Sequence, residues 1–147
     1  MGADLYSERV TRFLEAAETA VDGKPSLSDV AEYAYVAITP PGRSLVHVAG
    51  ACPLAPDGTT VAIGDVRGQA ARCVENLVQS LAAAGAGLGD VVKTTVYVAS
   101  AEQADLVAAW EVVRDAIAPH RPPSTLLGVA ALGYDDQLVE IEAVAAV

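Results

Sequence analysis

Residues 83–98 read AAGAGLGDVVKTTVYV, and the spacing of the apolar positions changes within this stretch. Just upstream, apolar residues follow one another in steps of three and four, which places them along one side of a helix: Ala70, Val74, Leu77, Leu81 and Ala84. Asp65 fits the N-cap of this helix, the glycines at 85–89 end it, and the β-branched run at 90–98 is typical of a strand. A long helix that leads directly into a strand indicates a domain with both element types.

A second helix is predicted after this strand. Ser100 and Gln103 fit a capping box at its start, and apolar residues recur at helical spacing: Leu106, Trp110, Val113 and Ile117. Prolines at 122 and 123 end it. Residues 124–132 and 137–145 then predict two more strands.

The N-terminal third predicts one helix and two strands. Residues 4–23 have helical apolar spacing, and Asp22-Gly23 with Pro25 stop the helix. Residues 32–38 and 44–50 read as strands joined through TPPGR as a hairpin. We therefore expect a helical extension over residues 1–30 and a single domain over 31–147.

The order of these elements predicts an α+β fold, in which two long helices pack on one face of a mixed sheet. The strands read largely apolar on both sides. We expect the uncovered face to pack against other copies of the chain; the alternative is that the N-terminal helix covers it.

Composition narrows the function classes. The 147 residues are 52% hydrophobic, which is ample for a core, and the net charge of −10 disfavours nucleic-acid and anionic-membrane partners. The longest apolar runs fall short of a membrane span, and no segment reads as a signal peptide. Cys52 and Cys73 lack the spacing of a metal or disulfide framework. A cytoplasmic protein is the expectation.

Two familiar kinds of site are disfavoured. GAGLGD (85–90) follows a helix and leads into a strand, whereas a dinucleotide loop follows a strand and opens a helix. The two histidines, His47 and His120, have no third ligand at a recognisable spacing. We therefore expect neither a bound cofactor nor a metal.

Near the C-terminus, the stretch QLVEIEAVAAV carries two carboxylates in an apolar strand, Glu140 and Glu142. Because side chains alternate along a strand, both acids point to the same face. Either they meet solvent at a sheet edge, or one lines a cleft and moves a proton or positions a water.

Several of these pieces together resemble the RidA/YjgF family. The helix ending and strand at 83–98, PPSTLLGVAAL followed by VEIEAVA, SLVHVAGACPL and EYAYVAI are similar to that family's elements in the same order, from about residue 31 to 147. The resemblance implies a chorismate-mutase-like fold and a homotrimer with three ligand clefts between subunits. It also implies cofactor-free hydrolysis of imines and enamines to a keto acid and ammonia.

The resemblance also assigns site residues. It places the family's water-positioning glutamate at Glu140, its tyrosine at Tyr33 and its cleft glycine at Gly50. The family's cysteine falls on Leu126, and its substrate-binding arginine falls on Ser124, whose hydroxyl cannot replace a bidentate charge.

Arg121 lies three residues upstream and is the candidate substitute for that arginine. We therefore expect a small, neutral or weakly polar ligand in an intersubunit cleft, with Glu140 as acid/base if the protein is catalytic. The alternative is a non-catalytic ligand-binding or regulatory module. Ribonuclease activity is a third reading, disfavoured by the charge of −10.

Overall fold

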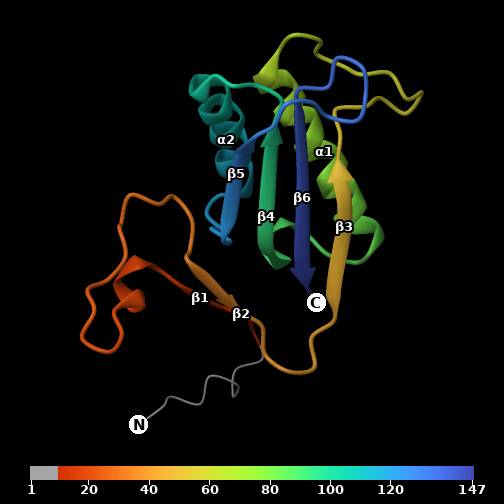
Figure 1. The fold of residues 1–147 in the computed structure, drawn as a ribbon. Helices are drawn as coiled ribbons and strands as arrows, with labels where there is room; N and C mark the ends of the chain where they lie inside the picture. The colour runs from red at the N-terminus through yellow and green to blue at the C-terminus, as the bar shows by residue number, and fades with distance from the viewer. Residues whose placement is uncertain (1–9) are drawn as a thin grey trace.

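The computed structural model describes residues 10–147 as a four-stranded sheet with two helices on one face and an N-terminal arm set apart from it (Figure 1). The strand order is β3-β6-β4-β5, so β3 and β5 form the two edges. The helices are α1 (Val66–Ala83) and α2 (Gln103–Ile117). The strands are β3 (Leu45–Ala51), β4 (Val91–Val98), β5 (Ser124–Gly128) and β6 (Val139–Ala146).

The sheet is mixed, as predicted. Strands β4 and β5 run parallel and are connected through α2, whereas β6 runs antiparallel to both of its neighbours, β3 and β4. A short 3-10 helix, η2 (Leu88–Asp90), occupies the glycine-rich turn between α1 and β4. The prediction of an α+β fold with two long helices on one face is confirmed.

The core lies between the helices and the sheet. The Asp65 carboxylate caps α1 by accepting a hydrogen bond of 3.0 Å from the backbone N–H of Gly68. Leu77 and Leu81 of α1 and Val113 of α2 are fully buried against apolar strand residues. The predicted helix stripes are confirmed at these positions, while Val74 and Trp110 stay partly exposed.

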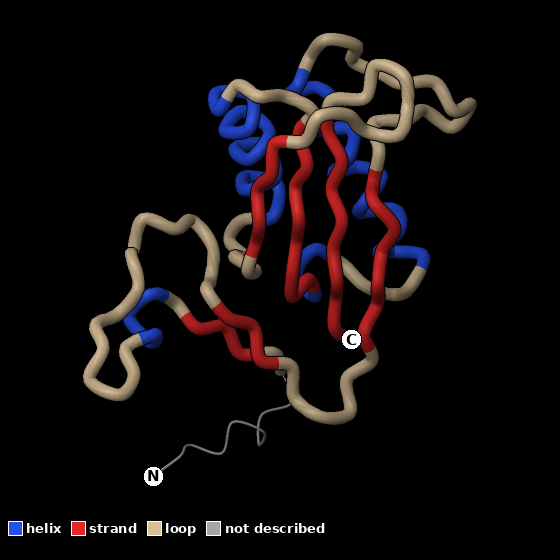
Figure 2. The backbone as a smooth tube through the Cα atoms, in the orientation of Figure 1, coloured by secondary structure: helices blue, strands red, loops and turns tan. Residues whose placement is uncertain are grey.

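The predicted N-terminal helix is wrong for residues 10–23, and its first residues lie outside the described part of the chain. The structure instead has β1 (Arg12–Leu14), a 3-10 helix η1 (Ala16–Thr19) and β2 (Val36–Ile38), which pairs antiparallel with β1. We call residues 10–38 the arm; in Figure 2 the tube of this segment lies beside the four-stranded sheet and outside it. Long-range contacts override the helical spacing: the Phe13 ring meets the His120 ring edge-on at 4.9 Å.

The predicted hairpin over residues 32–50 is also wrong. Strand β2 pairs with β1, and β3 pairs with β6, so the two segments belong to different sheets. The turn between them does form, with Gly42 at a φ of 86°, as a type II turn requires. Val46 and Val48 of β3 pack on the core. Pairing with β6 partly buries these two side chains, which explains why β3 pairs with β6 and not with β2.

The face of the four-stranded sheet away from the helices, which we call the open face, is more polar than the sequence suggested. It carries His47 from β3, Lys93 and Tyr97 from β4, and both glutamates from β6, with exposed Leu45 and Leu127 near its edges. Packing of this face against other copies stays a prediction. Within residues 10–147, the helices are too short or too polar to cross a bilayer.

Gly128 provides a stability test of the sheet edge. A Cβ at this position would lie 2.8 Å from the backbone oxygen of Ser100, which is part of the chain and cannot turn aside. Gly128→Ala is therefore expected to lower the free energy of unfolding by about 1–3 kcal/mol in urea denaturation. Gly89→Ala is the control, because a Cβ there meets nothing within 4 Å. Equal stability of the two variants would show that the backbone at this edge moves to accommodate a Cβ at position 128.

Candidate functional site

Glu140 lies at the start of β6, opposite Tyr97 of β4, with its side chain turned toward the end of β3. It passes directly over Gly50: a Cβ built on Gly50 would lie 2.7 Å from Glu140 Cδ and 2.9 Å from Cγ. The pairing of β3 with β6 is irregular between Val48 and Ala51, which is typical of a bulge. Gly50 therefore leaves the space in which the carboxylate sits.

One oxygen of this carboxylate has a defined partner. The Cys52 thiol donates to Oε1 of Glu140 over 3.0 Å, from a partly buried position just beyond β3. Desolvation and, after it, the hydrogen bond to Glu140 raise the pKa of the Cys52 thiol to about 11. We call Gly50, Cys52 and Glu140 the Glu140 cluster. It places an oriented carboxylate beside a protonated thiol.

The other acid of this strand is engaged differently. Glu142 accepts a hydrogen bond of 2.6 Å from the Tyr97 hydroxyl, and this bond raises the pKa of Tyr97. The register confirms that both acids share the open face, since Glu140 lies opposite Tyr97 and Glu142 opposite Thr95. Glu142 is exposed, whereas Glu140 is partly buried. Glu140 is therefore the more sheltered of the two acids, and its catalytic role stays a prediction.

A second group of predicted site residues gathers beside α2. Tyr33, Ser124 and Leu126 line a hollow of about 330 Å³ together with Trp110 and Thr125; we call it the Trp110 pocket. It adjoins a larger hollow of about 480 Å³ between the arm and the end of α2, which Tyr33, Trp110 and Ser124 also line, together with Arg121. Tyr33 and Trp110 meet edge-on, with ring centroids 5.8 Å apart.

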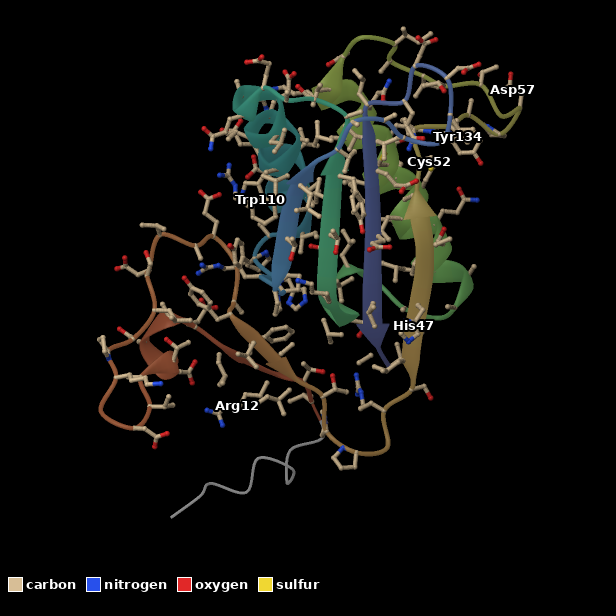
Figure 3. All side chains as sticks on the ribbon, viewed as in Figure 1. Arg12, His47, Cys52, Asp57, Trp110 and Tyr134 are labelled. Carbon is tan, nitrogen blue, oxygen red and sulfur yellow. The ribbon has the colours of Figure 1, made fainter. Side chains whose placement is uncertain are left out.

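The two groups do not meet within one chain. Ser124 lies opposite Thr94 and its Oγ is 2.6 Å from the buried Thr94 hydroxyl, so it points toward the helices. Glu140 points to the open face, on the other side of β4 and three residues further along it, about 10 Å in strand length. Figure 3 shows Cys52 beyond the end of β3 and Trp110 beside the opposite edge strand.

The two guanidinium groups that line the larger hollow already have partners. Arg114 pairs with Glu32 at 2.9 Å and with Asp115 at 2.8 Å. Arg121 donates to the backbone oxygen of Ala31 at 3.0 Å and lies 3.7 Å from the Glu15 carboxylate. Arg121 thus binds the arm in this chain. That its guanidinium binds a substrate stays a prediction.

The chain shows no built metal site in its described part: among residues 10–147, no three histidine, cysteine, aspartate or glutamate side chains gather as potential ligands. His120 makes a contact of 2.6 Å between Nε2 and the backbone oxygen of Val91. His47 lies on the open face in β3, whereas His120 lies in the loop that follows α2.

The protonation of Cys52 can be read by alkylation. With a pKa of about 11 instead of 9.0, the thiol forms about 100-fold less thiolate at pH 8 than an unperturbed one. Iodoacetamide is therefore expected to label native protein slowly at pH 8 and much faster near pH 11. Cys52→Ser should remove this reaction, since burial raises the pKa of the other thiol, Cys73, even further. Rapid labelling of Cys52 at pH 8 would contradict the burial of this thiol and its contact with Glu140.

The fluorescence of the single tryptophan, Trp110, reports whether the arm is bound to α2. Glu32 accepts a hydrogen bond of 2.7 Å from Trp110 Nε1 and pairs with Arg114, and both contacts lower the pKa of Glu32. Glu32→Ala removes both, so we expect Trp110 fluorescence to shift to longer wavelength as water reaches the indole. Asp29→Ala is the control, since Asp29 lines the same hollow but does not accept the hydrogen bond of the Trp110 indole. Identical spectra for Glu32→Ala and wild type would show that the arm docks by other contacts.

Two residues of these groups were missed in the sequence. Cys52 lacks the spacing of a disulfide or metal framework, and Trp110 falls on the apolar stripe of its helix, so the sequence pattern assigns neither of them to a site. A pattern signal for Cys52 did exist, because it lies two residues after Gly50, at the end of a strand that the family resemblance already placed in the cleft.

Comparison with known proteins decides the family. The profile of the Endoribonuclease L-PSP family matches residues 25–147, which is most of the chain. The chain belongs to this family, the RidA/YjgF family. A RutC family protein of Pyrococcus abyssi is 34% identical over 102 residues, covering 69% of this chain and 78% of the relative.

Solved structures agree with this assignment. The Rid family protein YyfB of Yersinia pestis, described as of unknown function, is 27% identical, with a TM-score of 0.77 and coverage of 93% of this chain and 98% of the other. A putative endoribonuclease of Thermotoga maritima is 30% identical, with a TM-score of 0.63 and coverage of 91% and 95%. The RidA/YjgF fold predicted from the sequence is therefore confirmed.

Proposed function

We propose that this RidA/YjgF protein hydrolyses a small, neutral imine or enamine to a carbonyl compound and ammonia, with Glu140 as the acid/base. The observation that carries the proposal is the held carboxylate: one oxygen of Glu140 is bonded to Cys52, and its stem rests on Gly50. A fixed carboxylate with a second, available oxygen is what activation of a water requires.

The proposed reaction is balanced through this one carboxylate. An enamine reacts as its imine tautomer. Water adds to the carbon of the C=N bond, its proton passes to Glu140, and Glu140 returns that proton to the nitrogen. The hydroxyl proton of the resulting carbinolamine then follows the same route. Ammonia leaves as the carbonyl forms, and the glutamate ends in its starting state.

The ligand is proposed to be neutral because position 124 offers a hydroxyl. Ser124 and Tyr33 supply polar contacts in the Trp110 pocket, while Leu126 and the indole supply apolar walls. The nearby guanidinium of Arg121 is bonded to the arm. A substrate with a carboxylate would find no bidentate partner among these residues.

The complete cleft is proposed to form between copies of the chain in a homotrimer. Glu140 and Ser124 point to opposite faces of one sheet, and the Glu140 cluster lies near the β3 edge while the Trp110 pocket lies at the β5 edge. A head-to-tail contact that closes into a ring brings the first group of one copy to the second group of the next. Light scattering that reports a single polypeptide in dilute buffer would overturn this arrangement.

Mixing two inactive variants tests the shared cleft directly. Glu140→Gln removes the acid, and Ser124→Trp fills the Trp110 pocket. If the two halves come from different copies, unfolding and refolding the variants together should restore part of the activity through mixed trimers. Activity that stays absent in the mixture, while each variant is folded and trimeric, would place both halves in one copy.

The reaction itself is tested with two imines made in situ. An amine oxidase supplies a neutral imine from a primary amine, and an amino-acid oxidase supplies a 2-imino acid. We expect the protein to accelerate ammonia release from the neutral imine, and Ser124→Arg to shift the preference toward the imino acid. Release no faster than in buffer with either imine would overturn hydrolysis.

The second candidate is a ligand-binding module without turnover. The observation that favours it is the serine at 124, because the scaffold is retained while the anion-binding residue is absent. Thermal stabilisation by the neutral imine or its carbonyl product, without faster ammonia release, would support this candidate.

A further inference from the structure

We propose that Cys52 is a positioning residue for Glu140: its thiol holds Oε1 and so leaves Oε2 free to take the proton of the attacking water. This inference rests on the proposed function and names a residue that the family resemblance does not assign, since the resemblance places the family's cysteine at Leu126 on another strand.

The thiol has one proton and two acceptors within reach. Oε1 of Glu140 lies 3.0 Å from Sγ, and the backbone oxygen of Gly50 lies at 3.6 Å. The shorter contact is to the charged acceptor, and hydrogen bonds to charged groups are the stronger ones. The thiol therefore donates to the carboxylate, which fixes one of the two oxygens of Glu140.

The thiol sits on a rigid support. Asn76 of α1 donates from Nδ2 to the backbone oxygens of Cys52, at 2.8 Å, and of Leu54, at 3.1 Å. The flanking residues Ala51 and Pro53 are buried. The loop after β3 is thus tied to the helix, and it holds the sulfur still while Glu140, a long side chain, loses rotamer freedom on docking against it.

The thiol keeps its proton at neutral pH. Desolvation is the larger cause of its raised pKa, followed by the bond to Glu140, while the Gln137 amide acts in the opposite direction. Cys52 therefore acts as a hydrogen-bond donor and does not present a standing thiolate that could compete with water as a nucleophile.

The two oxygens of Glu140 thus have different roles, and each of the three residues of the Glu140 cluster contributes to this difference. Gly50 leaves room for the stem of Glu140, and Cys52 occupies the oxygen nearer to β3. The other oxygen has no hydrogen-bond partner within residues 10–147. A carboxylate fixed at one oxygen presents the other in one direction, which favours a single water position over many.

The test combines kinetics with a spectroscopic reading of the thiol. In Cys52→Ala, kcat for the neutral imine should fall by about 10-fold, the loss expected for one hydrogen bond to a charged group, with KM unchanged. Cys52→Ser keeps a donor at the same place and should recover most of kcat. A merely structural role would instead lower stability in both variants and leave kcat of the folded protein intact.

The infrared S–H stretch reads the contact without turnover. The band assigned to Cys52 by its loss in Cys52→Ser should lie at lower frequency in wild type than in Glu140→Gln, because the carboxylate is the stronger acceptor. A wild-type protein that releases no ammonia overturns the proposed function. If wild type is active, two results would overturn the role of Cys52 alone. One is an unchanged kcat in Cys52→Ala, and the other is an S–H frequency that is the same in wild type and Glu140→Gln.

Discussion

Glu140→Gln is expected to lower the rate of ammonia release from a neutral imine by about 100- to 10,000-fold, the range for loss of a general acid/base. The amide has nearly the same shape as the carboxylate, so it still fits over Gly50 and can still accept from the Cys52 thiol. It cannot take a proton from water. Initial rates at saturating imine, measured on folded protein, give the effect on kcat.

Glu142→Gln is the matched control for this variant. Glu142 lies two residues further along the same strand and on the same face, but its carboxylate is exposed and engaged by the Tyr97 hydroxyl. Its substitution should leave kcat within a few-fold of wild type. Similar losses in the two variants would show that the charge of the open face, and not the position of one acid, supports the reaction.

The body of the fold was predictable because its signals are local. Three signals depend only on residues close in sequence: the Asp65 cap, the spacing of the buried leucines of α1, and the change of period before β4. The sheet order was constrained by the right-handed crossover between parallel strands, since α2 connects β4 to β5. Local signals and global topology agree in this part of the chain.

The arm was not predictable from the same signals. Phe13 and Leu14 fit a helical stripe, yet their contacts lie far along the chain: Phe13 packs on His120, and the backbone oxygen of Leu14 accepts from the N–H of Tyr35. Spacing along a sequence cannot reveal partners about 20 to 100 residues away, and tertiary contacts of this kind override helix propensity. The arm therefore became a strand where the pattern indicated a helix.

The candidate site was predictable in part. Strand alternation and the family resemblance both selected Glu140, and the structure places it against Gly50, as a shared site requires. The contact with Cys52 joins residues 88 positions apart, and nothing in the periodicity of either strand reports it. The sulfur meets the carboxylate because β3 and β6 pair in the sheet.

Gly50→Ala is expected to lower kcat for the neutral imine by about 10- to 100-fold while changing stability little. The added Cβ would lie 2.7 Å from Glu140 Cδ and 3.0 Å from Oε1, but these atoms end a flexible side chain, so the carboxylate moves and the backbone stays. A displacement of this size separates Oε1 from the Cys52 thiol, and misplacing a reacting group by about 1 Å can cost 100-fold in rate.

The control for this variant is Gly133→Ala, because a Cβ there meets nothing within 4 Å. Both variants should unfold at nearly the wild-type urea concentration, and only Gly50→Ala should lose activity and shift the Cys52 S–H band toward higher frequency. Full activity in Gly50→Ala would mean that Glu140 works equally well from another position, and the held carboxylate would then have no part in the reaction. Marked destabilisation of Gly50→Ala would instead make this glycine a residue of the bulge in β3 and not of the site.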